Sequence, residues 1–346
     1  MFFASKSKSF CVEIGEQATL VARLARSDES IIVEEIKEFS LGDVAGLGEW
    51  IKTTEGKGAT GYIHATCGIY PTKRIVRRQT LDLKRVKEPT YFNEIYTQQF
   101  RIEPDKYAIK ILNYNDGSDY DVIKAGQKEV IFCALPMDEI NGTQDNLLGS
   151  GIYPERLELG TLATLGGLIN YLKFKRSKSP VLVLEMGDEM TQSYIVSADG
   201  VDLSRTISSG VAAMIPVVQK ELGLKDQESA MKLFYSNTFD FTSMGGALVK
   251  KLLKELQSSI GFYEVQTGQS IGQVFCTQLP ANFSWLGATM AGALGVPQLR
   301  LDLIPWLESL QITLAESVVP NPPDDRWVGL FSLIASYDHA VPDEKK

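Results

Sequence analysis

The sequence holds few of the residue types that most enzymes use for catalysis or metal binding. It has two histidines, His64 and His339, and its four cysteines are scattered with no C-x-x-C pair. We therefore expect no zinc ribbon, redox motif or disulfide framework, but reduced thiols and no metal site. A catalytic triad needs a histidine with placed partners. His64 stands in an alternating segment, and we interpret it as a strand residue with a local hydrogen bond; a lone catalytic base is the alternative.

Long apolar runs are also absent. The longest candidate, residues 159–172, has Glu158 at its edge and Asn170 inside it, whereas a membrane-spanning helix needs roughly 18 or more consecutive apolar residues. The N-terminal sequence MFFASKSKSF has a short apolar start before Lys6, which is too little for the core of a signal peptide. We expect a cytoplasmic protein with no transmembrane segment of its own.

A basic charge balance is missing as well. Lysine and arginine number 35 against 43 acidic residues, which leaves a net charge of −8. A nucleic-acid partner is not expected, because such binding requires a basic surface that displaces counterions from phosphates. With 346 residues, of which 44% are hydrophobic, the chain has the size and composition of two packed lobes.

A short motif, in contrast, occurs twice. Residues 13–19 read EIGEQAT and residues 185–191 read EMGDEMT. Each copy follows an apolar strand and precedes a β-type segment, which predicts a β-hairpin that turns at Gly15 and at Gly187. The matching surroundings of the two copies favour gene duplication over a chance match.

Further elements follow each copy of the motif. Third strands are expected at 31–36 and at 201–207, so that each lobe opens with a three-stranded meander. Apolar residues at three- and four-residue spacing predict helices over 159–172 and 249–260. These helical faces suit packing against a sheet, because strands flank them; binding of a partner helix is the alternative.

The order of these motifs resembles that of the PilM family of actin-like type IV pilus assembly proteins. The likeness covers about residues 10–335 and depends on the order of the motifs, since none of them is invariant. The stretch 151–163 (GIYPERLELGTLA) is similar to the family segment that returns the chain to the first lobe, after a strand and helix like 130–136 and 138–148. The other similar segments are the second hairpin and its glycine turn at 181–210, the helix at 254–263 (KELQSSIGFY), and the strand, loop and helix at 273–297.

The resemblance implies an α/β chain with a duplicated actin-like (ribonuclease H-like) fold of two lobes and an inserted subdomain of the FtsA/PilM type. The parts it implies are 1–70 as subdomain 1A, 71–150 as the inserted subdomain 1C, 151–178 as the return to 1A, 179–210 as subdomain 2A, 211–270 as subdomain 2B, 271–338 as the return to 2A with a C-terminal helix packed on 1A, and 339–346 as a tail.

Actin-like ATPases hold nucleotide phosphates between two glycine hairpins, which usually begin Asp-x-Gly-[Thr/Ser]. Here Glu13 and Glu185 replace the aspartates, and Glu16 and Asp188 follow the glycines in place of hydroxyl residues. A carboxylate about 5 Å from a phosphate oxygen costs roughly 3 kcal/mol at an effective dielectric constant of 20. Added carboxylates in both hairpins therefore predict weak or absent ATP binding.

The adenosine loop differs from the superfamily as well. It is usually rich in glycine, but residues 277–281 read TQLPA, and Pro280 removes a backbone donor. We expect a degenerate nucleotide site, no catalytic residue, no cofactor and no ATP hydrolysis. The alternative is an active ATPase or small-molecule kinase in which the glutamates serve as longer ligands for the magnesium of Mg-ATP. The residues assigned to this site are Glu13, Gly15, Glu185, Gly187, Thr191 and Gly210.

The resemblance also implies partners. A groove between the first lobe and the inserted subdomain would receive the N-terminal cytoplasmic tail of a PilN-like inner-membrane protein. The chain would then be a scaffold at the inner face of the inner membrane, together with other components of a pilus or type II secretion platform. An FtsA-like filament former is a third reading, which the tail after Asp338 disfavours because it lacks an amphipathic anchor.

A basic cluster lies in the expected inserted subdomain, with Arg74, Arg77 and Arg78 at its centre. Three interpretations stay open: contact with anionic lipid, pairing with an acidic partner, or an ordinary solvated strand edge. Apolar residues alternate with these charges, which places the cluster on strands.

Overall fold

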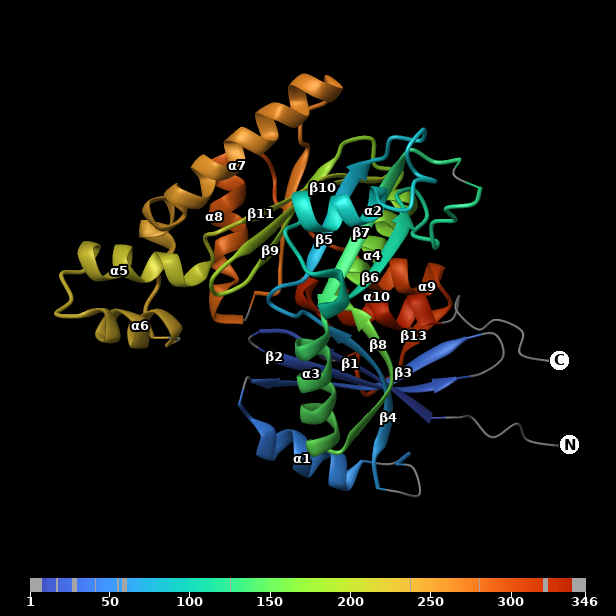
Figure 1. The fold of residues 1–346 in the computed structure, drawn as a ribbon. Helices are drawn as coiled ribbons and strands as arrows, with labels where there is room; N and C mark the ends of the chain where they lie inside the picture. The colour runs from blue at the N-terminus through green and yellow to red at the C-terminus, as the bar shows by residue number, and fades with distance from the viewer. Residues whose placement is uncertain are drawn as a thin grey trace, which may run out of the picture. The chain divides into compact units, whose positions relative to one another are not determined.

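The computed structural model describes residues 8–16, 18–26, 30–40, 42–54, 56–57, 61–124, 126–236, 238–279, 281–319 and 323–337. The chain forms two compact units. Unit 1 comprises residues 1–168 and 302–346, and unit 2 comprises residues 169–301. Figure 1 labels most of the helices and strands of both units.

Unit 1 is built on a six-stranded sheet with the strand order β13-β3-β2-β1-β4-β8. The hairpin β1-β2 is antiparallel and places Glu13 opposite Leu20, while the parallel neighbour β4 places Gly68 opposite Glu13. The strands are β1 Lys8–Ile14, β2 Ala18–Arg26, β3 Ile31–Ser40, β4 Ile63–Ile69, β8 Ile152–Leu159 and β13 Ile312–Leu314.

Helices cover both faces of this sheet. On one face, α1 (Val44–Thr53) buries Leu47, Trp50 and Ile51 against apolar residues of β1 and β4. The helix begins where the Asp43 carboxylate accepts a hydrogen bond from the Gly46 amide at 2.9 Å. On the other face lies α10 (Val328–Tyr337). The remaining helices of unit 1 outside the inserted subdomain are α4 (Gly160–Phe174), which continues into unit 2, α9 (Leu303–Ser309) and the 3₁₀ turn η6 (Asp325–Trp327).

The inserted subdomain lies between β4 and β8 in the sequence and has its own antiparallel sheet, in the order β5-β7-β6. Phe132 of β7 packs against Tyr91, Ile95 and Phe100 in a separate small core. The elements are β5 Ile75–Thr80, α2 Tyr91–Glu94, the π-helical turn η1 Ile95–Gln99, the 3₁₀ turn η2 Pro104–Lys106, β6 Tyr107–Asn113, β7 Glu129–Pro136 and α3 Met137–Gly149.

Unit 2 has a four-stranded sheet in the order β11-β10-β9-β12, and helices α7 and α8 contribute to the apolar core on one of its faces. The strands are β9 Val181–Met186, β10 Thr191–Ser197, β11 Gly200–Ile207 and β12 Gln273–Thr277. The helices and 3₁₀ turns are η3 Val211–Met214, α5 Ile215–Glu221, α6 Gln227–Tyr235, η4 Thr242–Met244, α7 Gly245–Thr267, η5 Ala281–Phe283 and α8 Trp285–Leu294.

The two sheets repeat one plan, which confirms the predicted duplication. In each unit a hairpin is extended by a third antiparallel strand, and a later strand runs parallel to the first strand of the hairpin. Glu185 pairs with Gln192 of β10 and Thr277 of β12, as Glu13 pairs with Leu20 and Gly68. The predicted third strands and helices are present as well, as β3, β11, α4 and α7.

The boundary of the units differs from the expected one. We expected the second lobe to begin at 179, and residues 271–338 to return to subdomain 2A and end in a helix packed on 1A. The compact units divide after Leu168 and again after Leu301, and the C-terminal helix α10 does contact β1 and β4 of the first sheet. The returning segment joins the first sheet because β13 pairs in parallel with β3, with Ile312 opposite Ile31. The expected tail, 339–346, and His339 lie outside the described residues.

Candidate functional site

The two predicted hairpins turn with the same backbone geometry. The Gly15 amide donates to the Ala18 carbonyl at 3.0 Å, and the Gly187 amide donates to the Met190 carbonyl at 2.9 Å. The local turn chemistry that the sequence repeats therefore produces the same turn in both units. The side chains around the two turns differ.

In the first hairpin, the Glu13 carboxylate is held inside unit 1. The residue is only 2% exposed. The Tyr70 hydroxyl donates a hydrogen bond to Glu13 Oε1 at 2.6 Å and lies 3.1 Å from Thr164 Oγ1. Gly329 of α10 packs against the same carboxylate so closely that an added Cβ would overlap it. Glu13 thus connects β1 with α4 and α10.

In the second hairpin, the predicted residues gather in one place. The Gly187 carbonyl accepts from the Val211 amide at 3.0 Å, and Gly210 lies so close to the hairpin carbonyls that a Cβ would overlap them. Thr191 is fully buried, and its hydroxyl donates to the Ser209 carbonyl at 2.7 Å. Glu185 is buried as well. Glycine at 210 is therefore a packing requirement of the hairpin.

The carboxylate of Asp188 has a partner that the sequence did not reveal. The Tyr235 hydroxyl of α6 donates to Asp188 Oδ1 at 2.9 Å, and the Tyr235 carbonyl accepts from Asn282 Nδ2 at 3.2 Å. The hairpin, α6 and the segment after β12 are thereby linked. Glu16 is partly exposed, whereas Gln17 of the first hairpin and Pro280 of the expected adenosine loop lie outside the described residues.

Arg74 is a correction to the expected basic surface. It is 7% exposed, and its guanidinium donates to Thr161 Oγ1 at 3.0 Å and to the Pro71 carbonyl at 2.9 Å. The side chain lies over the Tyr70 ring, 5.5 Å from its centre. Arg74 therefore supports the buried polar region around Glu13, and its burial keeps it from contacting a membrane or a partner.

Arg77 and Arg78 lie on β5, which is a terminal strand of the inserted sheet. The Arg77 guanidinium stacks 5.3 Å from the centre of the Phe100 ring. Arg78 donates to Glu129 Oε2 at 3.1 Å and stacks 4.7 Å from the centre of the Tyr114 ring. Both side chains are partly exposed. These contacts within the subdomain are typical of an ordinary charged strand edge, which is the third of the interpretations given above.

A groove with a volume of about 580 Å³ lies in unit 1, between the β3–α1 segment and α3, the helix that follows the inserted sheet and packs through Leu147 on the core of the first sheet. Ile14, Phe39, Val44 and Leu47 supply apolar lining, and Asn146 lies on the α3 side. Val44 is 62% exposed at the start of α1. The groove therefore offers both apolar contact and polar groups to a ligand.

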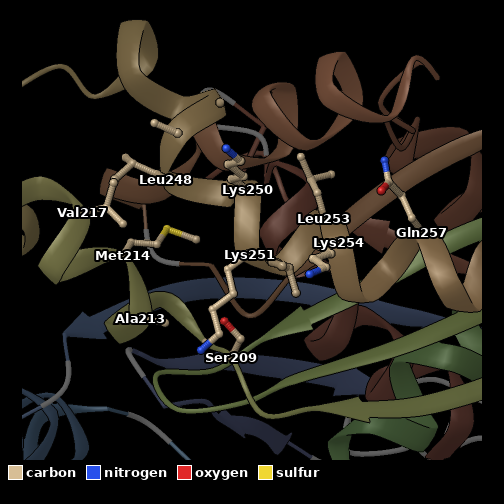
Figure 2. A pocket seen from close by; sticks show the side chains of 14 residues that line it. Ser209, Ala213, Met214, Val217, Leu248, Lys250, Lys251, Leu253, Lys254 and Gln257 are labelled. Atoms are coloured by element: carbon tan, nitrogen blue, oxygen red, sulfur yellow. The ribbon is translucent and has the colours of Figure 1, made fainter. Parts of the chain in front are cut away.

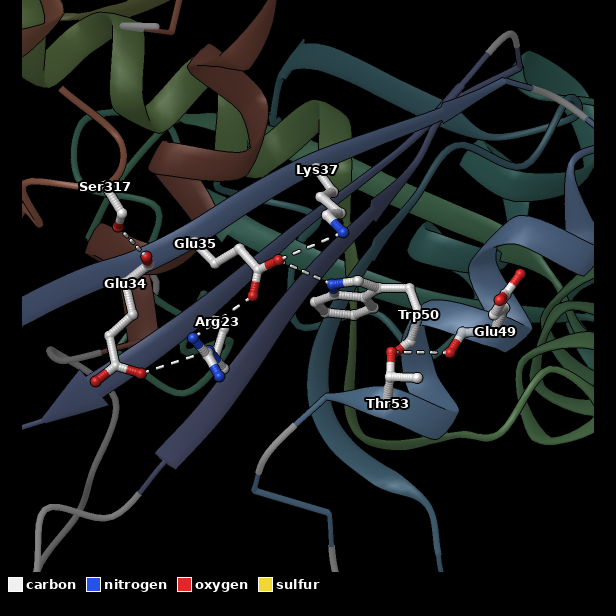
Figure 3. A network of polar contacts seen from close by, with 8 residues as sticks. All are labelled: Arg23, Glu34, Glu35, Lys37, Glu49, Trp50, Thr53 and Ser317. Atoms are coloured by element: carbon white, nitrogen blue, oxygen red, sulfur yellow. Dashed lines mark hydrogen bonds and ion pairs between the residues drawn. The ribbon is translucent and has the colours of Figure 1, made fainter. Parts of the chain in front are cut away.

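The helix that frames this groove is anchored to the sheet by a polar network (Figure 3). The Trp50 indole of α1 donates to Glu35 Oε1 of β3 at 3.0 Å. Arg23 of β2 lies 3.4 Å from a carboxylate oxygen of Glu34 and 3.5 Å from one of Glu35. Since Trp50 is also buried against Phe10 and Phe39, α1 is held in one place by both packing and charge.

His64 lies on β4, as predicted for a strand residue. Its Nδ1 is 3.0 Å from Glu155 Oε1 of β8, and its ring packs 5.0 Å from that of Tyr153. In the part of the chain that the structure describes, no three histidine, cysteine or acidic residues are grouped as a metal site would require. None of the helices in that part combines the length and apolar character needed to cross a bilayer.

Comparisons with known proteins agree on the fold. No family model and no curated protein matches the sequence. Among solved structures, a chain of the PilM–PilN type IV pilus biogenesis complex matches with a TM-score of 0.64 and 15% identity, over 96% of this chain and 99% of that chain.

Two further structures match less closely. The ethanolamine utilization protein EutJ from Carboxydothermus hydrogenoformans has a TM-score of 0.45 and 10% identity, over 95% of this chain and 89% of that one. The cytoplasmic domain of EpsL, an inner-membrane component of the type II secretion system of Vibrio cholerae, has a TM-score of 0.41 and 9% identity, over 96% of this chain and 95% of that one.

The first match and the duplicated sheet order together show that this chain has the actin-like fold. The resemblance to the PilM family that the motifs indicated is thus confirmed at the level of the fold. The contacts of Tyr70, Thr164, Gly329 and Tyr235 were not predicted, because each joins segments that lie far apart in the sequence.

Proposed function

We propose that this protein is a PilM-like scaffold of a type IV pilus or type II secretion assembly platform, and that it binds the N-terminal cytoplasmic tail of a PilN-like membrane protein. The observation that carries the proposal is the groove between the β3–α1 segment and α3, next to the inserted sheet in the sequence, in a chain whose fold matches one chain of the PilM–PilN complex. The protein would act at the cytoplasmic face of the inner membrane with other platform components.

The chemistry of the groove supports a short peptide as its ligand. Phe39, Val44 and Leu47 offer apolar contacts, while Asp43 and Asp145 place carboxylates along the groove. Peptide recognition requires a preformed groove with side-chain pockets and needs no catalytic group. The anchoring of α1 by Trp50 supports a preformed site, because little has to be ordered on binding.

We further propose that ATP hydrolysis has been lost and that nucleotide binding is weak or absent. The Glu13 carboxylate is engaged by Tyr70, and the Asp188 carboxylate by Tyr235. A nucleotide with its magnesium would have to compete with these contacts and would meet the negative charge that Asp188 adds after Gly187, whereas Glu13 replaces an aspartate and leaves the charge at its position unchanged. These carboxylates support a pseudo-ATPase, and the retained hairpin turns record its ancestry.

A binding measurement tests the scaffold proposal. A labelled synthetic peptide with the sequence of the tail of a PilN-like protein from the same organism is titrated with the purified chain, and anisotropy is recorded. Val44→Lys is expected to weaken binding by about tenfold, because it places a cation at an apolar contact. Val265→Lys is the matched control, since Val265 is 83% exposed on α7 of unit 2. Absence of binding, or equal loss in both variants, would contradict the proposal.

The alternative of an active ATPase or small-molecule kinase is tested separately with millimolar Mg-ATP. A ligand that binds the folded state raises the melting temperature by mass action. We expect no shift and no phosphate release. A rise of several degrees in the melting temperature would contradict the pseudo-ATPase proposal and would favour the alternative in which Glu13 and Glu185 bind the magnesium of Mg-ATP. The result of the peptide titration would be unaffected.

Membrane proximity is tested with vesicles that contain phosphatidylglycerol. Arg77→Glu with Arg78→Glu is expected to reduce sedimentation with the vesicles if β5 faces the lipid. Lys220→Glu with Lys225→Glu changes the net charge equally at exposed positions of unit 2. Unchanged recovery of the arginine variant would leave Arg77 and Arg78 with the role of a strand edge alone.

A further inference from the structure

A second groove lies in unit 2, between the N-terminal half of α7 and the segment formed by η3 and α5. Its volume is about 650 Å³. Figure 2 shows Met214 and Val217 on one side facing Leu248 of α7, and Lys251 extending toward Ser209. We call this depression the α7 groove. Gly210 also lines it, so one end adjoins the second hairpin.

The rim of the α7 groove is basic. Lys250, Lys251 and Lys254 all lie on its edge and are exposed. Within the described part of the chain, none of these three ammonium groups forms a hydrogen bond or an ion pair. Arg205, near the same helix, is instead paired with Glu255 at 2.9 Å. The chain as a whole has a net charge of −8, so these three neighbouring lysines give the rim of the groove a positive charge that the rest of the chain does not share.

The helix itself adds to this positive potential. α7 begins at Gly245, its first turn contains no acidic residue, and the three lysines lie within its first three turns. The unsatisfied amides of a helix N-terminus carry a partial positive charge. An anionic group over the first turn of α7 would therefore meet partial positive charge from the backbone, whereas one over Lys251 and Lys254 would meet the charge of these side chains.

We propose that the α7 groove binds an acidic amphipathic segment of a partner protein. Apolar side chains of that segment would enter between Met214, Val217 and Leu253, while its carboxylates would meet Lys251 and Lys254 at the rim. This surface is on a different unit from the groove proposed for the membrane-protein tail, so the protein would carry two docking sites of different chemistry. The proposal does not depend on the identity of the first partner.

Two other occupants fit the lining less well. A nucleotide base would find no aromatic ring or arginine to stack on, and ribose hydroxyls would find no carboxylate among the side chains that line the groove. A bilayer could reach the lysines on the rim, but the apolar groups lie inside a concave depression that a flat surface does not enter. Both occupants are outcomes of the experiment below.

The probe is a fluorescein-labelled peptide of about four helical turns with leucine at i, i+3 and i+4 spacing and glutamate elsewhere. One comparison peptide replaces every glutamate by lysine, and another keeps the composition but scrambles the leucine spacing. We expect saturable binding of the first peptide only, with an affinity that decreases as salt rises because ion pairs contribute. Hydrogen exchange of residues 209–217 and 245–257 should slow in the complex.

Lys251→Glu with Lys254→Glu is expected to weaken this binding by about tenfold, since two attractive rim contacts become repulsive. The control is Lys178→Glu with Lys225→Glu, an equal charge change at exposed lysines of the same unit outside the groove. Should the glutamate variant fail to fold, Lys251→Gln with Lys254→Gln makes the same comparison. Val217→Ser tests the apolar part and is expected to weaken binding without changing its salt dependence.

Several results would overturn the proposal. These are no binding of the acidic peptide, equal binding of the scrambled or basic peptide, and equal loss in the groove and control variants. Lysine-dependent binding of Mg-ATP that displaces the peptide would assign the groove to a nucleotide. Lysine-dependent binding to phosphatidylglycerol vesicles without peptide binding would assign it to a membrane surface.

Discussion

The Tyr70 hydroxyl donates a hydrogen bond of 2.6 Å to Glu13, so the residue that follows the end of β4 holds the carboxylate at the end of β1. Glu13 and Tyr70 are both buried, and Thr164 of α4 lies next to the same hydroxyl. The position that carries an aspartate in actin-like ATPases is thus occupied by a side chain with a structural contact. This contact connects the sheet, α4 and the turn before the inserted subdomain.

Tyr70→Phe is expected to reduce the free energy of unfolding by about 1–3 kcal/mol, because a buried acceptor loses its donor. Urea unfolding followed by circular dichroism measures the change. Tyr153→Phe is the control, since Tyr153 is 48% exposed, and should change stability little. Equal stability of the wild type and the Tyr70 variant would show that the contact contributes nothing.

Tyr235→Phe removes the hydrogen bond between α6 and Asp188 of the second hairpin. We expect amide exchange in α6 to accelerate by roughly fivefold, since a typical hydrogen bond contributes about 1 kcal/mol to local stability. Hydrogen-exchange mass spectrometry of unit 2 measures this effect. Exchange in α8 serves as the internal reference, and a uniform acceleration across the unit would mean global destabilisation instead.

Two adjacent glycines of α4 should respond in opposite directions to alanine. A Cβ at Gly167 would overlap Ser332 of α10, so Gly167→Ala is expected to cost about 1–3 kcal/mol of stability. A Cβ at Gly166 would meet no other atom, so Gly166→Ala should raise the free energy of unfolding by about 0.5–1 kcal/mol through helix propensity. Melting temperatures that move in the same direction for both variants would contradict the packing of α10 on α4.

Glu158 should make the stability depend on pH. Burial raises the pKa of its carboxyl above the ordinary 4.5, although Arg156, at 2.7 Å, acts in the opposite direction. The folded state therefore holds the proton more tightly than the unfolded chain, and this contribution to stability is lost as pH rises from below 4.5 through the raised pKa.

Glu158→Gln removes that dependence, so the variant should gain stability relative to the wild type between pH 4 and pH 7, as measured by urea unfolding at both values. Glu308→Gln, at an exposed position, is the control. A relative loss of stability over the same interval would show that the Arg156 contact dominates the pKa of Glu158 instead.

The local elements of the fold followed from the sequence because their causes are local. Gly15 and Gly187 turn their hairpins through the same hydrogen bond, and the strands beside them were recognisable by apolar alternation. The helices α4 and α7 followed from three- and four-residue spacing. The sequence placed the two glutamates at the hairpins correctly, but it did not predict which side chains surround them.

The surroundings depend on contacts between distant segments. Arg74 belonged to a basic run, yet it is buried because Thr161 and the Pro71 carbonyl satisfy its guanidinium. β13 joined the first sheet because its residues pair with β3, about 280 positions earlier. No periodicity within either segment specifies such a pairing.

Residue types and spacing were therefore sufficient to establish the duplicated architecture and the substitution of both aspartates, since turn formation and amphipathic patterns act over a few residues. The other features were set by the tertiary structure alone. These are the hydrogen bonds of Glu13 and Asp188, the burial of Arg74 and the two grooves. Each of these depends on side chains that chain topology brings within hydrogen-bonding or packing distance, and such distances are not encoded in any one segment.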